Sequence, residues 1–246
     1  MQYVKNTLLF LYQWLIFVPV FVLLTLLTAI TVMILSPLFG NKIWGYHPPK
    51  WWSKLTCWLA LCRVKRKIKG RLNPNQSYVF IGNHQGAFDI FLVYGFLNQN
   101  IKWVQKQSLR KIPFVGKASE IAGHVFVDNS SVAARKRTIE KAEKEVSDGV
   151  SIMMFPEGSR SKNGKLDKFK RGAYLIALDM KLPIVPLTLN GPFDVLNVHS
   201  FLIHPGKLEL VVHEPIPTDG LTEKDIPALM EQTKETIHSA LWDKYK

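Results

Sequence analysis

His84 and Asp89, five residues apart, are a pair whose side chains could do acid–base chemistry. The apolar run Tyr78–Ile81 predicts a strand that ends just before His84, and the apolar residues after Asp89 predict a helix. Asp89 then falls in or near the first helical turn, where its carboxylate can accept the imidazole N–H. A histidine oriented in this way can take a proton from an alcohol with its other nitrogen. Taken alone, the pair fits an ordinary loop histidine equally well.

A second polar segment, Phe155-Pro156-Glu157-Gly158-Ser159-Arg160-Ser161, follows another apolar run. Gly158 permits a tight turn, and the guanidinium of Arg160 can bind a phosphate through its fork of donors. Ligands bind α/β sheets at the carboxyl ends of parallel strands, so this segment is a candidate binding loop. A solvated surface loop is the alternative for this segment taken alone.

The elements that must position these residues begin after residue 70. Short β-rich runs alternate there with helical ones, which predicts an α/β fold with a largely parallel sheet flanked by helices. The predicted strands are Tyr78–Ile81, Ile101–Val104, Val125–Asp128, Ser151–Phe155, Ile184–Leu189 and Leu208–His213. The predicted helices are Ile90–Leu97, Val132–Ser147, Gly172–Met180 and Thr222–Trp242.

The N-terminal part is basic and apolar. Residues 1–88 contain no Asp or Glu but ten Lys or Arg, so most of the net charge of +13 lies beside the apolar N-terminus. This placement favours an anionic membrane over nucleic acid as the partner, and a solubilising charge run is the alternative. Leu8–Leu35 exceeds both the ~20 residues of a spanning helix and the apolar core of a signal peptide. With Pro19 inside it and Pro37 at its end, it predicts one kinked spanning helix or a re-entrant hairpin.

A second stretch, Trp51–Cys62, combines tryptophans with lysines, as helices at a membrane interface do. A core-facing amphipathic helix has the same periodicity and is the alternative. A basic cluster follows, and by the positive-inside rule it predicts that the next domain lies on the cytoplasmic face. We therefore predict a membrane anchor with interfacial helices over residues 1–62 and a catalytic domain over residues 63–246. Cys57 and Cys62 lack metal-ligand partners nearby and are predicted to be reduced packing residues.

Taken together, four sequence blocks resemble the lysophosphatidate and glycerol-phosphate acyltransferase family. They are an H-x4-D block (Asn83, His84, Asp89), an F-P-E-G-[ST]-R-S block (Phe155–Ser161), a Val-Pro block (Val185, Pro186) and a K-x-x-L-x-x-x-P-x-x-G block (Lys106, Leu109, Pro113, Gly116). They occur in the family's order over roughly residues 64–215, which argues against a chance match.

One block departs from the family. Its second motif usually ends in Ile-Asp-Arg, whereas this chain has Val127-Asp128-Asn129. In relatives that arginine is assigned to the acceptor phosphate, so Asn129 leaves the acceptor's identity or affinity open. Arg135, Lys136 or Arg137 in the following predicted helix are candidates to replace the charge, although they are equally suited to a solvated face.

The resemblance implies a mechanism and a set of site residues. His84 would act as general base on the acceptor hydroxyl, which attacks a thioester carbonyl directly without an acyl-enzyme, and Asp89 would orient His84. Backbone N–H groups after Asn83 are candidates for oxyanion stabilisation. The resemblance further implies that the glycerol phosphate is bound by Lys106, Glu157, Gly158 and Arg160. It implies no metal and no cofactor, with acyl-CoA or acyl carrier protein as the donor substrate.

The implied activity is transfer of a fatty acyl group to the free hydroxyl of 1-acyl-sn-glycerol-3-phosphate, giving phosphatidic acid in phospholipid biosynthesis. The partners would be membrane lipids and the acyl donor, without nucleic acid. Glycerol-3-phosphate or a lysolipid without phosphate remain alternative acceptors, and a non-catalytic lipid-binding relative is a further alternative. A serine hydrolase is disfavoured because the sequence has no G-x-S-x-G nucleophile elbow.

Overall fold

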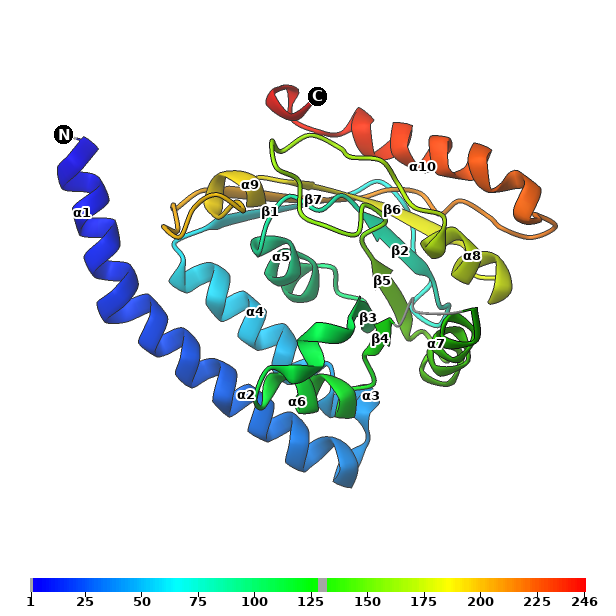
Figure 1. Cartoon of the computed structure of the whole chain (residues 1–246), viewed down its shortest axis with the longest axis horizontal. Coiled ribbons are helices and arrows are strands. Elements are labelled where there is room, and N and C mark those ends of the chain that lie inside the picture. The colour runs from blue at the N-terminus through cyan, green and yellow to red at the C-terminus, as the bar shows by residue number, and fades with distance from the viewer. Residues whose placement is uncertain (1, 128–131) are drawn as a thin grey trace.

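A single sheet forms the centre of the protein. The computed structural model describes residues 2–127 and 132–246, and within them seven strands lie in the order β1-β7-β6-β2-β5-β3-β4 (Figure 1). The strands are β1 (Arg63–Ile68), β2 (Val79–Gly82), β3 (Ile101–Lys106), β4 (Val125–Val127), β5 (Ser151–Met154), β6 (Ile184–Asn190) and β7 (Lys207–Val212). Neighbouring strands are parallel except β6 and β7, which are antiparallel. The predicted fold class is therefore confirmed.

The central strand β2 shows why this part of the fold could be predicted from the sequence. Val79, Phe80 and Ile81 are all fully buried, because helices cover both faces of the sheet. Phe80 belongs to the core cluster under α5, whereas Val79 and Ile81 belong to the cluster on the opposite face. A strand buried on both sides must be uniformly apolar, and such a run stands out in a sequence.

Helices form a layer on each face of the sheet (Figure 1). The helices α4 (His47–Leu59) and α5 (Phe88–Phe96) cover one face, and α8 (Gly172–Asp179) and α10 (Ile226–Ser239) cover the other. The remaining elements of this domain are α6 (Val115–Ile121), α7 (Val132–Glu145), α9 (Pro192–Val195), η2 (Gln107–Lys111), η3 (Glu223–Asp225) and η4 (Asp243–Tyr245). The sequence did not predict α6, which is only two turns long.

The apolar N-terminal run forms one continuous helical rod. It consists of α1 (Gln2–Tyr12), a π-helical turn η1 (Gln13–Phe17) and α2 (Val18–Phe39). The stretch Asn6–Phe39 has a mean hydropathy of 2.7 and is long and apolar enough to cross a membrane. Its irregular turn lies just before Pro19, as expected from a ring that disturbs the preceding turn. Because the rod contains no reversal, the run Leu8–Leu35 is not a hairpin but one helix with an irregular turn, and its spanning of a membrane stays a prediction.

The chain reverses only after this rod, at Gly40, and after the short α3 (Asn41–Trp44) it returns as α4 beside α2. The Trp52 Nε1–H donates to Thr25 Oγ1 at 3.0 Å, and the Tyr12 hydroxyl donates to the Leu59 carbonyl at 2.9 Å. These two pairs fix an antiparallel arrangement, in which α4 lies between the rod and α5 (Figure 1). Whether residues 1–62 form a unit apart from residues 63–246 stays a prediction.

Helix α4 combines both interpretations of the Trp51–Cys62 stretch. Ser53, Thr56 and Cys57 are buried on its inner face, whereas Trp51 and Trp58 are exposed on its outer face. The helix is therefore core-facing on one side and presents tryptophans on the other. Cys57 and Cys62 are free cysteines, as predicted.

The basic cluster after α4 is a strand that the sequence did not reveal. Arg63–Ile68 forms β1 at the edge of the sheet, paired in parallel with β7. Only Val64 is partly buried, so the strand lacks the apolar signature of the central strands. Charged side chains on an edge strand also oppose pairing with a second chain.

Candidate active site

His84 and Asp89 form the pair that their spacing predicted. Strand β2 ends at Gly82 and α5 begins at Phe88, so Asp89 lies in the first turn of the helix. The distance from His84 Nδ1 to Asp89 Oδ2 is 2.7 Å, and the same oxygen accepts the N–H of Gly86 at 2.8 Å. Asp89 is fully buried, whereas the His84 side chain keeps 17% of its surface exposed. The carboxylate thus lies behind the imidazole, and the imidazole faces outward.

The electrostatics of this pair suit a general base. Burial raises the pKa of Asp89, and its contacts with His84 and the backbone oppose that rise. A carboxylate that accepts from Nδ1 fixes the tautomer in which Nε2 is free to take a proton. Within residues 2–127 and 132–246, Nε2 makes no hydrogen bond. When Nε2 takes a proton, the buried carboxylate stabilises the imidazolium that results.

Two further residues hold His84 in place. The ring of Phe155 stacks on the imidazole with centroids 4.1 Å apart and an angle of 3° between the planes. The side chain of Asn83 forms two hydrogen bonds with Leu189 of β6, donating to its carbonyl at 2.9 Å and accepting its N–H at 2.8 Å. The end of β2 is therefore fixed to its neighbouring strand, and the imidazole plane is fixed by an aromatic ring.

Glu157 links the two loops of the site. One carboxylate oxygen accepts the backbone N–H of His84 at 2.8 Å, and the other accepts the N–H of Asp167 at 3.0 Å. Burial raises the pKa of Glu157 to about 7, although these hydrogen bonds act to lower it. The Ser161 N–H in turn donates to the carbonyl of His84 at 2.7 Å. Both backbone polar groups of His84 are therefore bonded to the Phe155–Ser161 loop.

These contacts correct the expected source of oxyanion stabilisation, and they concern the expected role of Glu157 as well. The N–H groups of His84 and Gly86 donate to Glu157 and Asp89, so neither is free to stabilise an oxyanion as the sequence suggested. Both oxygens of Glu157 have backbone partners. Its predicted contact with the glycerol phosphate therefore stays a prediction, whereas its contact with the His84 backbone is present.

Cationic side chains lie around the same edge of the sheet. Lys106 is the last residue of β3, next to β5, and Arg160 is exposed in the loop that follows β5. Gly158 has a φ of +75°, and a Cβ there would lie 2.6 Å from the ammonium of Lys170. The positive φ favours glycine at this position, and the Lys170 ammonium lies close beside it. Lys106, Arg160 and Lys170 form no ion pair among the residues that the structure describes.

Lys170 was missed by reasoning from the sequence, because it is one of several lysines in a charged loop and no spacing distinguishes it. Asp128 and Asn129, at the divergent motif, lie outside the described residues. The backbone of Arg135, Lys136 and Arg137 belongs to α7, but their side chains also lie outside what the structure describes.

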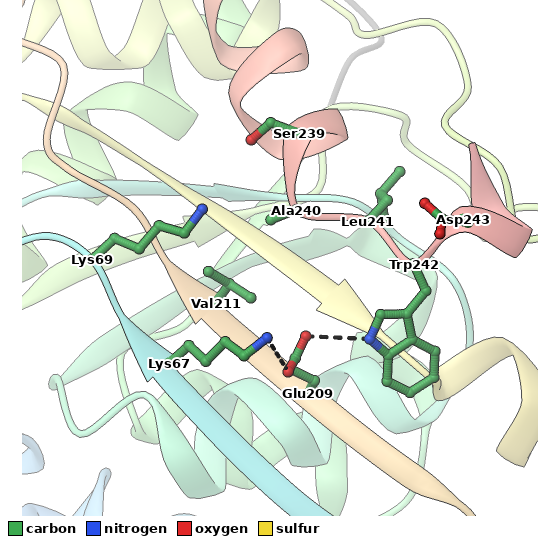
Figure 2. Close-up of a pocket in the computed structure, with 9 residues that line it drawn as sticks. All are labelled: Lys67, Lys69, Glu209, Val211, Ser239, Ala240, Leu241, Trp242 and Asp243. Atoms are coloured by element: carbon green, nitrogen blue, oxygen red, sulfur yellow. Dashed lines mark hydrogen bonds and ion pairs between the residues drawn. The ribbon is translucent and has the colours of Figure 1, made fainter.

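A separate cleft lies between the sheet edge and the C-terminal end of α10, and it contains none of the predicted site residues (Figure 2). Figure 2 shows the carboxylate of Glu209 held there by Lys67, 2.8 Å away, and by Trp242 Nε1 at 3.2 Å. The Trp242 ring stacks on Tyr245, which packs against Gly164 in the loop after Ser161. This cleft therefore marks a structural tie between β1, β7 and the C-terminal tail.

Comparison with known proteins shows which family and which solved fold this chain resembles. The family model described as Acyltransferase matches residues 63–190. The human 1-acyl-sn-glycerol-3-phosphate acyltransferase alpha is 32% identical over 182 residues, covering 71% of this chain and 62% of the relative. The 1-acyl-sn-glycerol-3-phosphate acyltransferase of Cocos nucifera is 33% identical over 165 residues, covering 67% of this chain and 54% of the relative. The chain thus spans less than two thirds of the length of these relatives.

Among solved structures, the 1-acyl-sn-glycerophosphate (LPA) acyltransferase PlsC from Thermotoga maritima is similar over almost the whole chain. The TM-score is 0.78 and the sequence identity is 26%, with 99% of this chain and 100% of that chain covered. The likeness includes the N-terminal helices, which the family model does not reach.

Proposed function

This chain belongs to the acyltransferase family, and we propose that it transfers a fatty acyl group from a thioester donor to the free hydroxyl of 1-acyl-sn-glycerol-3-phosphate. The observation that carries the proposal is the His84–Asp89 pair, with Nδ1 held at 2.7 Å and Nε2 open. An alcohol is a poor nucleophile near neutral pH, so its attack requires a base positioned to remove its proton.

In the proposed reaction, His84 Nε2 removes the proton from the hydroxyl while the hydroxyl oxygen attacks the carbonyl carbon of the thioester. Asp89 stabilises the imidazolium, and Phe155 and Asn83 keep the ring in position. The tetrahedral intermediate collapses by breaking the carbon–sulfur bond, and the imidazolium returns its proton to the departing thiolate. An ester and a free thiol are formed, without a covalent acyl-enzyme.

The acceptor's phosphate would be bound by the cations near the catalytic pair. Arg160 can offer two parallel hydrogen bonds, and Lys106 and Lys170 can add point charges. We propose that Lys170 supplies a positive charge in place of the arginine that is missing at position 129, because Lys170 lies against Gly158 in the same loop as Arg160. Glu157 is proposed to act as a positioning residue through the His84 backbone.

The lysolipid acceptor is a membrane component, which agrees with the apolar rod Asn6–Phe39 and the exposed tryptophans of α4. We propose that the rod anchors the protein and that the catalytic domain lies on the cytoplasmic face, as the basic residues after α4 suggest. The donor is proposed to be acyl-CoA or acyl carrier protein, and the basic surface suits either of these anionic thioesters.

Purified full-length protein should convert lysophosphatidate in mixed vesicles to phosphatidic acid with at least one of the two donors. His84→Ala should lower turnover ~10²-fold or more, since this is the scale of a general base. As a control, His238→Ala should leave turnover unchanged, because His238 is an exposed residue of α10. Acylation of lysophosphatidylcholine but not of lysophosphatidate would refute the headgroup, and trapping of an acyl-enzyme would refute the direct attack.

A further inference from the structure

The loop between α9 and β7, residues 196–206, exposes an aromatic side chain far from the core. Phe201 is 93% exposed, the highest value among the large apolar side chains that the structure describes. The whole loop, Leu-Asn-Val-His-Ser-Phe-Leu-Ile-His-Pro-Gly, contains no Asp, Glu, Lys or Arg. An uncharged loop that presents a phenylalanine to the outside requires an explanation, because exposing that ring to water stabilises nothing.

This loop is fastened to the N-terminal rod by one side chain. Gln13 donates from Nε2 to the carbonyl of Phe201 at 2.7 Å, and its Oε1 accepts the N–H of Ile203 at 2.8 Å. The two bonds lie on either side of Leu202 and hold the backbone of the loop as a neighbouring strand would. Gln13 is only 6% exposed and begins the π-helical turn η1. The loop and this turn lie side by side in Figure 1.

We call the two hydrogen bonds of Gln13 with the 196–206 loop the clamp. The residues of the rod next to the clamp are apolar. Trp14, Leu15 and Ile16, which follow Gln13 directly, are all exposed. An amide side chain within such a segment is costly in a bilayer unless both of its polar atoms are bonded. The loop supplies both partners, so the geometry meets the requirement that lipid imposes and water does not.

We propose that the 196–206 loop is a second membrane contact, which inserts Phe201 into the acyl-chain region of the bilayer, with Gln13 as the residue that positions it. The occupant is lipid, because the loop is uncharged and adjoins the most apolar segment of the chain. The proposal rests on the proposed membrane position of the rod, but it requires no acyl transfer.

The base of the same loop reaches the catalytic residues. A Cβ on Gly86, between His84 and Asp89, would lie 2.6 Å from the carbonyl oxygen of Leu196. His199 Nε2 lies 3.0 Å from the carbonyl of Lys162, just beyond the Phe155–Ser161 segment. Insertion of the tip would therefore set the height of the catalytic pair above the lipid surface.

The test places an environment-sensitive fluorophore at single positions of the full-length protein. A variant with Cys57→Ala and Cys62→Ala receives Phe201→Cys or, as the matched control, Leu221→Cys, and each is labelled and bound to phosphatidylcholine–phosphatidylglycerol vesicles. Leu221 is an exposed apolar residue shortly before α10, which covers the face of the sheet opposite to α4. We expect a blue shift and quenching by lipid-borne nitroxides at position 201, and neither at position 221.

The clamp is tested by adding Gln13→Leu, which removes both hydrogen bonds while keeping an apolar helix. Quenching at position 201 should fall at least severalfold, whereas Thr31→Val, which alters another polar residue of the rod, should leave it unchanged. A label at position 201 that stays in water on fully bound protein would overturn the membrane contact, whether or not the protein is active. Unchanged quenching after Gln13→Leu would overturn the positioning role.

Discussion

The buried carboxylate of Glu157 should make stability depend on pH in a characteristic direction. Burial raises the pKa of this group from 4.5 to about 7, so between these values the folded protein holds a proton that the unfolded chain has released. Stability contributed by this proton is present below about pH 4.5 and is lost as the pH rises through about 7. At 1.36 kcal/mol per pKa unit, the loss approaches ~3 kcal/mol. Glu157→Gln, which cannot ionise, should not show this loss.

The measurement is chemical unfolding in detergent micelles, followed by tryptophan fluorescence at about pH 5 and about pH 8. Relative to wild type, Glu157→Gln should gain ~2–3 kcal/mol of unfolding free energy between the two pH values. Glu231→Gln, at an exposed position of α10, is the matched control and should gain nothing. A difference in stability between wild type and Glu157→Gln that is the same at both pH values would refute the raised pKa. Because the amide cannot accept both N–H groups of the site, the variant should also lose turnover at either pH.

Three further outcomes are expected. Arg160→Ala and Lys170→Ala should each raise the KM for lysophosphatidate about ten- to a hundredfold in steady-state kinetics, because each removes one charge-assisted contact. The control Lys168→Ala should leave this KM unchanged. Asn129→Arg should lower that KM or leave it unchanged, and complete loss of activity on the native acceptor would indicate a different headgroup. Deletion of residues 1–40 should impair vesicle retention and activity on bilayer lysolipid more than activity on a short, water-soluble acceptor. A truncated protein that still sediments fully with vesicles in high salt would show that the main membrane contact lies elsewhere.

The sequence predicted the parts of the fold that are buried on both sides or determined locally. Six of the strands could be located because their apolar runs stand between turn signals, whereas β1 could not, since an edge strand with charged side chains lacks that pattern. The contact between His84 and Asp89 was predictable because it is local: the two residues lie five positions apart, and a strand end followed by the start of α5 brings them together.

The features that the sequence did not reveal depend on contacts between distant segments. Gln13 is 188 residues from Phe201 in the chain, and nothing in the apolar N-terminal run indicates what its amide would bind. Lys170 reaches Gly158 only because the intervening loop folds back on itself. The two hydrogen bonds that Glu157 accepts from backbone N–H groups likewise depend on how this loop lies against the end of β2.

The contacts that fix His84 are independent of the motif in which this chain departs from the family. The imidazole and its backbone are held by Asp89 of α5, by the loop after β5 through Phe155, Glu157 and Ser161, and by β6 through Asn83. None of these contacts comes from β4, which pairs only with β3 at the far edge of the sheet. Asn129 follows β4 in the sequence, so under the proposed function a change at this position would alter the charge offered to the acceptor and leave these contacts of His84 in place. If the proposed function holds, acceptor choice and proton transfer are separable in this fold, and variation after β4 would change the preferred headgroup while His84 and Asp89 stay the same.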